Sequence, residues 1–249
     1  MQVIFAGVLA TALIALAPAT PASNLTVREL VDRHTEARGG REALQAIHSL
    51  EYSLRIEEPG YTVDAVYRIQ RAGRMRIDIY TDGNRVFSEG YDGLHAWQWP
   101  QDKRYGEPVS EDGEAALLHG IQLPIHINGL HQMTHQGHLV GYLGMKPFNG
   151  KDTYALKIVL KDHTEVFYFL DPNTWQIIGN RDFRAFHPAV DSEKKWHETR
   201  FSDFREVEGV TRAFVSENYD LKTGERVGRT TITDIKVNPE FEAGFFQKP

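Results

Sequence analysis

The sequence contains no cysteine among its 249 residues. No disulfide can therefore form, and the stability of the protein must come from an ordinary hydrophobic core. An acyl anchor on a bacterial lipoprotein is attached to a cysteine at the cleavage point. We therefore expect a protein that carries no lipid anchor of its own.

Charged residues are missing from the first 22 positions. Residues 3–16 are almost wholly apolar, and small residues follow them, with an Ala-x-Ala cleavage site at residues 17–19. This layout predicts a secretory signal peptide over residues 1–22, followed by a single domain over residues 23–249 and export to the periplasm. No basic residue precedes the apolar run, which leaves the true start of translation open. An N-terminal membrane anchor is the alternative for this segment.

Several signatures of catalysis and of nucleic-acid binding are also missing. The sequence has no Gly-x-Ser-x-Gly elbow, no phosphate-binding glycine loop and no dinucleotide fingerprint. Its 28 basic and 34 acidic residues are interspersed and give a net charge of −6. We expect a monomer that is not an enzyme, needs no cofactor and does not bind nucleic acid.

The chain from residue 48 onward has a two-residue hydrophobic period. Leu50, Tyr52, Leu54 and Ile56 alternate with polar residues, and similar runs continue to residue 237 between turns such as Asp92-Gly93. Such alternation predicts antiparallel strands with one apolar face and one solvated face.

Two segments have a helical pattern instead. Residues 26–38 place their apolar side chains on one helical face, and Thr26 and Glu29 have capping-box spacing. Gly39-Gly40 ends this helix, a short helix follows over residues 41–47, and residues 110–120 form another. The sequence thus predicts a mainly β (α+β) fold. Its core is an incomplete antiparallel barrel of about 10–11 strands, with an N-terminal helix and a helical insertion covering the concave face.

Large apolar and aromatic side chains recur on the predicted strands. In a curved sheet they can either fill a core or line a cavity for an apolar ligand. We expect the following residues to line such a cavity: Tyr52, Leu54, Ile56, Tyr67, Ile69, Met75, Ile77, Ile79, Trp97, Trp99, Tyr154, Leu156, Phe167 and Phe169.

Several segments, in this order, resemble a known family. They are the Arg-rich hairpin of residues 67–79, the Asp-Gly and Trp of residues 91–97, the hairpin of residues 149–172 that ends in Leu-Asp-Pro, and the closing segments 201–210 and 235–249. Together they are similar to outer-membrane lipoprotein-sorting proteins, the LolA/LolB-like superfamily. The start at residues 39–44 is instead like a broader branch of that superfamily.

The resemblance implies a half-open barrel with helices as a lid and a cavity that shields acyl chains from water. It implies a lipid or acylated protein as cargo, with inner- and outer-membrane transport components as possible partners. Because the resemblance is to the broader branch, another lipid or an apolar small molecule is an equal expectation. A strand arginine contacts the lid in such carriers, and the matching hairpin offers four candidates: Arg68, Arg71, Arg74 and Arg76.

A histidine cluster supports a different hypothesis, a periplasmic metal-binding protein. His119, His126, His131, His135 and His138 fall within twenty residues, and the last three have spacing that could share one helical face. The alternative is a solvated insertion that is rich in histidine. A third hypothesis is a non-catalytic interaction module that uses an exposed sheet edge.

Overall fold

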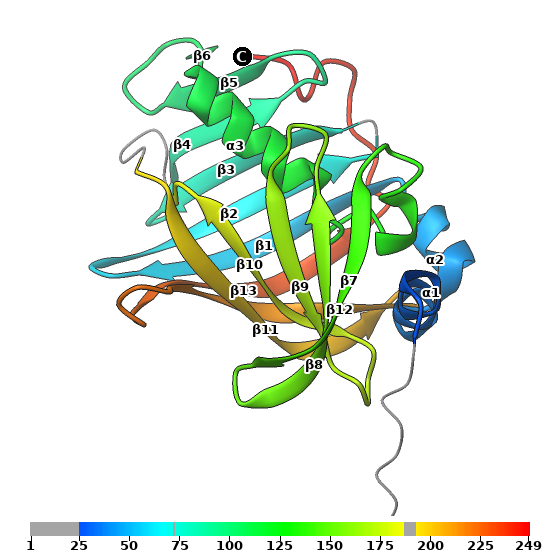
Figure 1. Ribbon diagram of the computed structural model, residues 1–249. Coiled ribbons are helices and arrows are strands. Elements are labelled where there is room, and N and C mark those ends of the chain that lie inside the picture. The colour runs from blue at the N-terminus through cyan, green and yellow to red at the C-terminus, as the bar shows by residue number, and fades with distance from the viewer. Residues whose placement is uncertain (1–24, 72, 187–192) are drawn as a thin grey trace, which may run out of the picture.

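The computed structural model describes residues 25–71, 73–186 and 193–249. The predicted signal peptide, residues 1–22, lies outside these ranges. Within them the chain forms one antiparallel sheet of thirteen strands and three α-helices (Figure 1).

The sheet consists of two meanders joined through the pair β1–β13. Its order is β6-β5-β4-β3-β2-β1-β13-β12-β11-β10-β9-β8-β7. Apart from β1 and β13, all neighbouring strands are also consecutive in the chain. The bounds are β1 Ser49–Glu58, β2 Tyr61–Gln70, β3 Arg74–Thr81, β4 Asn84–Tyr91, β5 Ala96–Pro100, β6 Glu107–Pro108, β7 Leu139–Phe148, β8 Lys151–Val159, β9 Glu165–Leu170, β10 Ile177–Arg184, β11 Lys195–Val207, β12 Val210–Asp220 and β13 Arg226–Val237.

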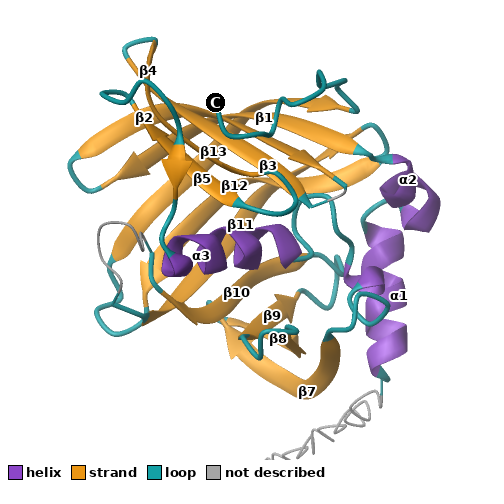
Figure 2. Cartoon of the chain, turned by 90° about the horizontal axis from the view of Figure 1, so that it is seen from above, coloured by secondary structure: helices purple, strands orange, loops and turns teal. Residues whose placement is uncertain are grey.

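The barrel is incomplete because β6 and β7, the two edges of the sheet, do not pair with each other. The segment that connects them contains α3 (Glu111–Gln122) and the 3-10 turn η1 (Leu130–Gln132), and Figure 2 shows α3 lying across the open side. The prediction of a half-open antiparallel barrel is confirmed. The strand number is thirteen, not 10–11, and the two-residue strand β6 is too short to give an alternating pattern.

The N-terminal helices cover one end of the concave face. Helix α1 (Val27–Ala37) begins with the predicted capping box, in which the amide of Glu29 donates to Thr26 Oγ1 and the amide of Thr26 donates to Glu29 Oε2. Helix α2 (Gly40–Ala46) follows directly. The buried side chain of Leu30 joins α1 to a core under η1, and Leu44 joins α2 to a second core on β1–β3.

Gly39 separates α1 from α2 with φ of 117°, a conformation that glycine adopts without steric cost. A Cβ at this position would overlap the carbonyl oxygen of Gly209 in the β11–β12 turn. We expect Gly39→Ala to lower the free energy of unfolding by about 2–3 kcal/mol, measured by urea denaturation. Gly60→Ala is the matched control, since Gly60 also has a positive φ but nothing within 4 Å of the added carbon. Equal losses in the two variants would contradict the close approach at Gly39.

Candidate functional site

A cavity of about 1270 Å³ lies between the concave face of the sheet and α3. Its walls come from strands of both meanders, and its cover comes from α3 and from residues 123–126. Cavities that hold small ligands usually measure about 300–1,000 Å³, so this one has room for a long or branched apolar molecule.

Seven of the predicted cavity residues lie in its wall. They alternate along the first three strands, which turns every second side chain toward the concave face. These seven are Tyr52, Leu54, Ile56, Tyr67, Met75, Ile77 and Ile79.

Three other predicted residues share the concave face but are packed beneath the helices, outside the cavity lining. Ile69 is fully buried in the core beside α2, and Leu156 is fully buried in the core beneath α1. Tyr154 stacks on Trp175, with ring centroids 5.3 Å apart. These positions form core because α1, α2 and η1 pack on this part of the concave face.

The remaining four predicted residues lie on the opposite, convex face. Trp97 pairs with Gly90, and Trp99 pairs with Ser88, whereas their neighbour Gln98 lines the cavity. Phe167 and Phe169 alternate with Tyr168, which is buried in the concave core. Counting aromatic residues does not distinguish the two faces of a strand; the register across the sheet does.

The second meander supplies cavity residues that were not predicted from the sequence. Phe201, Phe214 and Ile232 line the cavity from β11, β12 and β13. The alternation Arg212, Phe214, Ser216 and Asn218 on β12 is a sequence signal for the same wall, since all four line the cavity.

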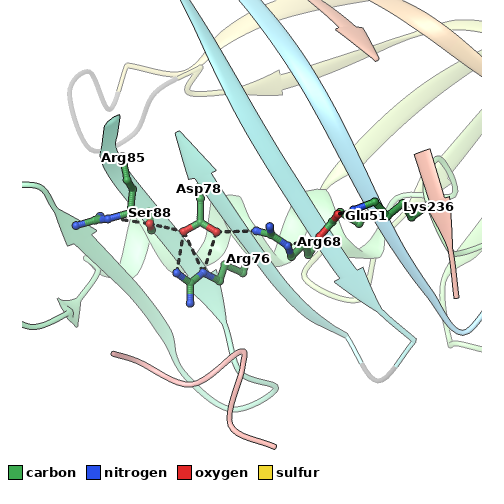
Figure 3. A network of polar contacts seen from close by, with 7 residues as sticks. All are labelled: Glu51, Arg68, Arg76, Asp78, Arg85, Ser88 and Lys236. Carbon is green, nitrogen blue, oxygen red and sulfur yellow. Dashed lines mark hydrogen bonds and ion pairs between the residues drawn. The ribbon is translucent and has the colours of Figure 1, made fainter. Parts of the chain in front are cut away.

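Two of the four candidate arginines for the lid contact lie on the convex face of the sheet. Arg68 and Arg76 point away from the cavity into a network on the convex face, where both bind the carboxylate of Asp78 (Figure 3). The network extends from Asp78 to Ser88 and from Arg68 to Glu51. The alternation of side chains along a strand explains this orientation, because Arg68 and Arg76 occupy the polar face of their strands.

Arg71 and Arg74 lie near the turn between β2 and β3. The guanidinium group of Arg71 donates to the carbonyl oxygens of Ile47 (2.7 Å) and Leu44 (2.5 Å), and so fixes the end of α2. Arg74 lies close to Gly93 on the turn before β5.

Two other arginines hold the segment that covers the cavity. Arg38, which ends α1, donates to the carbonyl oxygens of Pro124 (3.3 Å) and Ile125 (3.5 Å). Arg212 on β12 donates to the carbonyl oxygen of His126 at 2.8 Å. Residues 124–126 are hereafter called the lid segment. A pattern of strand residues gave no signal for Arg38, because it lies at a helix end.

Two histidines of the predicted metal cluster lie in the cover of the cavity but contact different meanders of the sheet. The Nε2 atom of His119 on α3 lies 3.2 Å from the carboxylate of Asp182 on β10. His126 packs against the rings of Tyr52 and Tyr67, at centroid distances of 5.5 and 5.1 Å. Burial and the charges of nearby arginines lower the pKa of His126 to about 4.

The other three histidines of the cluster do not come together either. His131 and His138 are buried, and His135 is exposed. Across residues 25–71, 73–186 and 193–249, no group of three or more His, Asp or Glu side chains is arranged to hold a metal ion. The i, i+4 spacing required a continuous helix, but η1 ends at Gln132.

His34 on α1 is a cavity residue outside the predicted cluster. Its Nδ1–H donates to the carbonyl oxygen of Trp175 at 2.8 Å, and its side chain is 2% exposed. Burial, followed by the charge of Arg38, lowers the pKa of His34 to about 3 from 6.5.

Acidification from pH 6.5 to 5 is expected to destabilise the protein through His34. In this range the unfolded chain binds a proton at His34 that the folded state does not bind. The stability contributed by neutral His34 is therefore complete above pH 6.5 and falls by up to about 1.4 kcal/mol per pH unit as the pH drops toward 3. Urea denaturation at several pH values should show that the free energy of unfolding of His34→Gln falls less steeply with decreasing pH than that of the wild type. The matched control is the exposed residue His163, and His163→Gln reproducing the change would contradict this assignment.

No protein-family model and no curated protein matches the sequence. Solved structures do match the fold. A LolA superfamily protein from Nitrosomonas europaea has a TM-score of 0.57 and 14% identity, over 90% of this chain and 98% of that chain. A domain from Vibrio parahaemolyticus described as an outer membrane lipoprotein-sorting protein has a TM-score of 0.59 and 10% identity, over 88% and 95%.

A DUF1329 family protein from Desulfovibrio piger is similar to the same extent, with a TM-score of 0.56 and 11% identity over 89% of this chain and 97% of that chain. The chain therefore has the LolA-like fold that the sequence resemblance predicted. In the described ranges, no helix has the length and apolar character needed to cross a membrane.

Proposed function

We propose that this chain is a carrier that binds the acyl chains of a lipid or a lipidated protein outside the cytoplasm. The observation that carries the proposal is the cavity of about 1270 Å³ between the open sheet and its helical cover. Each methylene buried in such a cavity contributes roughly 0.8 kcal/mol, so a single acyl chain supplies ample binding free energy.

The architecture also supports release of the cargo. The sheet is not closed, and the cover consists of α3 and the lid segment, which connect the edge strands β6 and β7. A cover attached through side-chain contacts can move without breaking the sheet. The interaction-module hypothesis would require a packed concave face, and the cavity favours a carrier instead.

The location and partners belong to the same proposal. The apolar pattern of residues 1–22 supports export, and the sorting function given for the Vibrio parahaemolyticus domain supports transfer of cargo between membranes. We propose membrane components as donor and acceptor of the cargo.

A neutral fluorescent probe tests cavity binding directly. Titration of the purified chain with 1-N-phenylnaphthylamine should give saturable fluorescence enhancement, and hexadecanol should displace the probe. Native mass spectrometry of protein purified from a membrane-rich extract should show bound lipid. A chain that takes up neither the probe nor any lipid is not a carrier.

A further inference from the structure

Two arginines line the otherwise largely apolar cavity and are almost completely buried. Arg38 and Arg212 are each 5% exposed. Their hydrogen bonds go to carbonyl oxygens of the lid segment and to the hydroxyl of Tyr52, and in the described ranges neither forms an ion pair with Asp or Glu. Arg184, another cavity residue, differs from them because it binds the carboxylate of Asp182 at 3.0 Å. Buried charges are normally paired, so Arg38 and Arg212 form an uncompensated positive site.

The hydrogen bonds of Arg212 leave one edge of its guanidinium group free. Its Nη1 donates to the hydroxyl of Tyr52 (3.2 Å) and to the carbonyl oxygen of His126 (2.8 Å). Its Nε and Nη2 have no partner among the described residues. These two N–H groups form the edge that binds the two oxygens of a carboxylate in parallel.

The charges around Arg38 and Arg212 favour the binding of an anion between these two side chains. The charge of Arg212 is the strongest influence on Arg38 after burial, and together they lower the pKa of Arg38 to about 10. The cavity lining contains five acidic residues, of which Asp182 is bound to Arg184 and His119. The other four are Glu58, Glu89 on β4, Asp112 on α3 and Asp162 in the turn after β8. Glu58 lies six residues beyond Tyr52 on β1, about 20 Å along the strand.

We propose that the ligand is an amphiphile with one long acyl chain and a carboxylate head, and that Arg38 and Arg212 bind this head. The inference rests on the proposed function and names the chemical class of its ligand. The hydroxyl of Tyr52 lies at the same place and can donate to the second face of the head.

The chain of the ligand has a continuous apolar path from this head site. Strands β1 and β12 both pair antiparallel with β13 and therefore run in the same direction. From Tyr52 the wall continues through Leu54 and Ile56, and from Arg212 it continues through Phe214. The acyl chain would lie along these residues toward the far end of the cavity.

Binding of the head has a consequence for the lid segment. The free Nε and Nη2 atoms of Arg212 are covered by protein in this structure. An anion reaches them when the carbonyl oxygens of residues 124–126 give up their bonds to Arg38 and Arg212. A charged oxyanion is a stronger acceptor than these neutral carbonyls, so it can replace them.

Competition against 1-N-phenylnaphthylamine tests the head preference with three ligands of sixteen carbons: palmitate, hexadecanol and hexadecyl phosphate. We expect palmitate to bind at least tenfold more tightly than hexadecanol in the wild-type chain. In Arg212→Gln and in Arg38→Gln this preference should fall to within about twofold, while hexadecanol still binds. Retained hexadecanol binding shows that each variant is folded.

Arg184→Gln is the matched control, because Arg184 lines the same cavity but has a carboxylate partner. It should keep the preference for palmitate. Equal binding of palmitate and hexadecanol by the wild type would overturn the anionic head and leave the carrier function intact. Tighter binding of hexadecyl phosphate than of palmitate would overturn the carboxylate assignment. Failure of all three ligands to bind would count against the carrier function itself.

Discussion

Replacing Asp78 with alanine is expected to lower the free energy of unfolding by about 3–5 kcal/mol. The side chain of Asp78 is 4% exposed and binds Arg68 at 2.7 Å and Arg76 at 2.8 Å (Figure 3). It also accepts a hydrogen bond from Ser88 at 2.6 Å. The alanine variant leaves two largely buried cations without this carboxylate, and that desolvation cost dominates the loss. Urea denaturation monitored by tryptophan fluorescence measures it.

Asp64→Ala provides the control on a neighbouring strand. Asp64 is largely exposed, and its nearest ion pair, with Arg55, has a separation of 3.9 Å. Exposed pairs of this kind contribute about 1 kcal/mol or less. If Asp78→Ala were no more destabilising than Asp64→Ala, the convex network would not stabilise the sheet.

The second large effect concerns the cavity. Leu54→Glu is expected to weaken binding of hexadecanol by about a hundredfold or more, because an acyl chain in the cavity would remove the new carboxylate from water. Leu54 lies in the wall opposite α3 and pairs with Ile232 on β13, another wall residue. Displacement of 1-N-phenylnaphthylamine measures the change, and circular dichroism verifies that the sheet is intact.

Arg55→Glu is the matched control for this variant. Arg55 is the next residue on β1, so its side chain points to the exposed convex face. The control places a glutamate one residue further along the same strand, on its other face, and should bind hexadecanol like the wild type. Equal loss in both variants would show that the effect is electrostatic at long range or a general destabilisation, not exclusion from the cavity.

Local sequence patterns predicted much of the fold. The capping box at Thr26 and Glu29, the break at Gly39 and the alternating strands are all signals within a few residues, and all are present. The half-open barrel followed from these signals, since a long one-faced sheet needs helices to cover it. The wall residues on β1–β3 were predictable for the same reason, because their alternation is strict.

The sequence did not decide which apolar residues face the cavity on the other strands. Trp97 shows why: its indole is buried against the C-terminal segment and donates to the carbonyl oxygen of Phe246, 149 residues away. The face that a strand presents depends on its register with its neighbours, and that register is set by contacts between distant residues. The family resemblance offered four hairpin arginines as candidates for one lid contact, and choosing among them required the same register information.

By itself, the sequence determined the secondary structure, the open antiparallel sheet and one wall of the cavity, because short-range periodicity encodes them. The tertiary structure decided which charges are buried and what they meet. Arg38 at a helix end and Arg212 on a strand are 174 positions apart in the chain, counted from their residue numbers. They meet under one lid segment because the β11–β12 turn packs against the end of α1, where the amide of Thr211 donates to the carbonyl oxygen of Arg38. No pattern of neighbouring residues in the sequence predicts that contact.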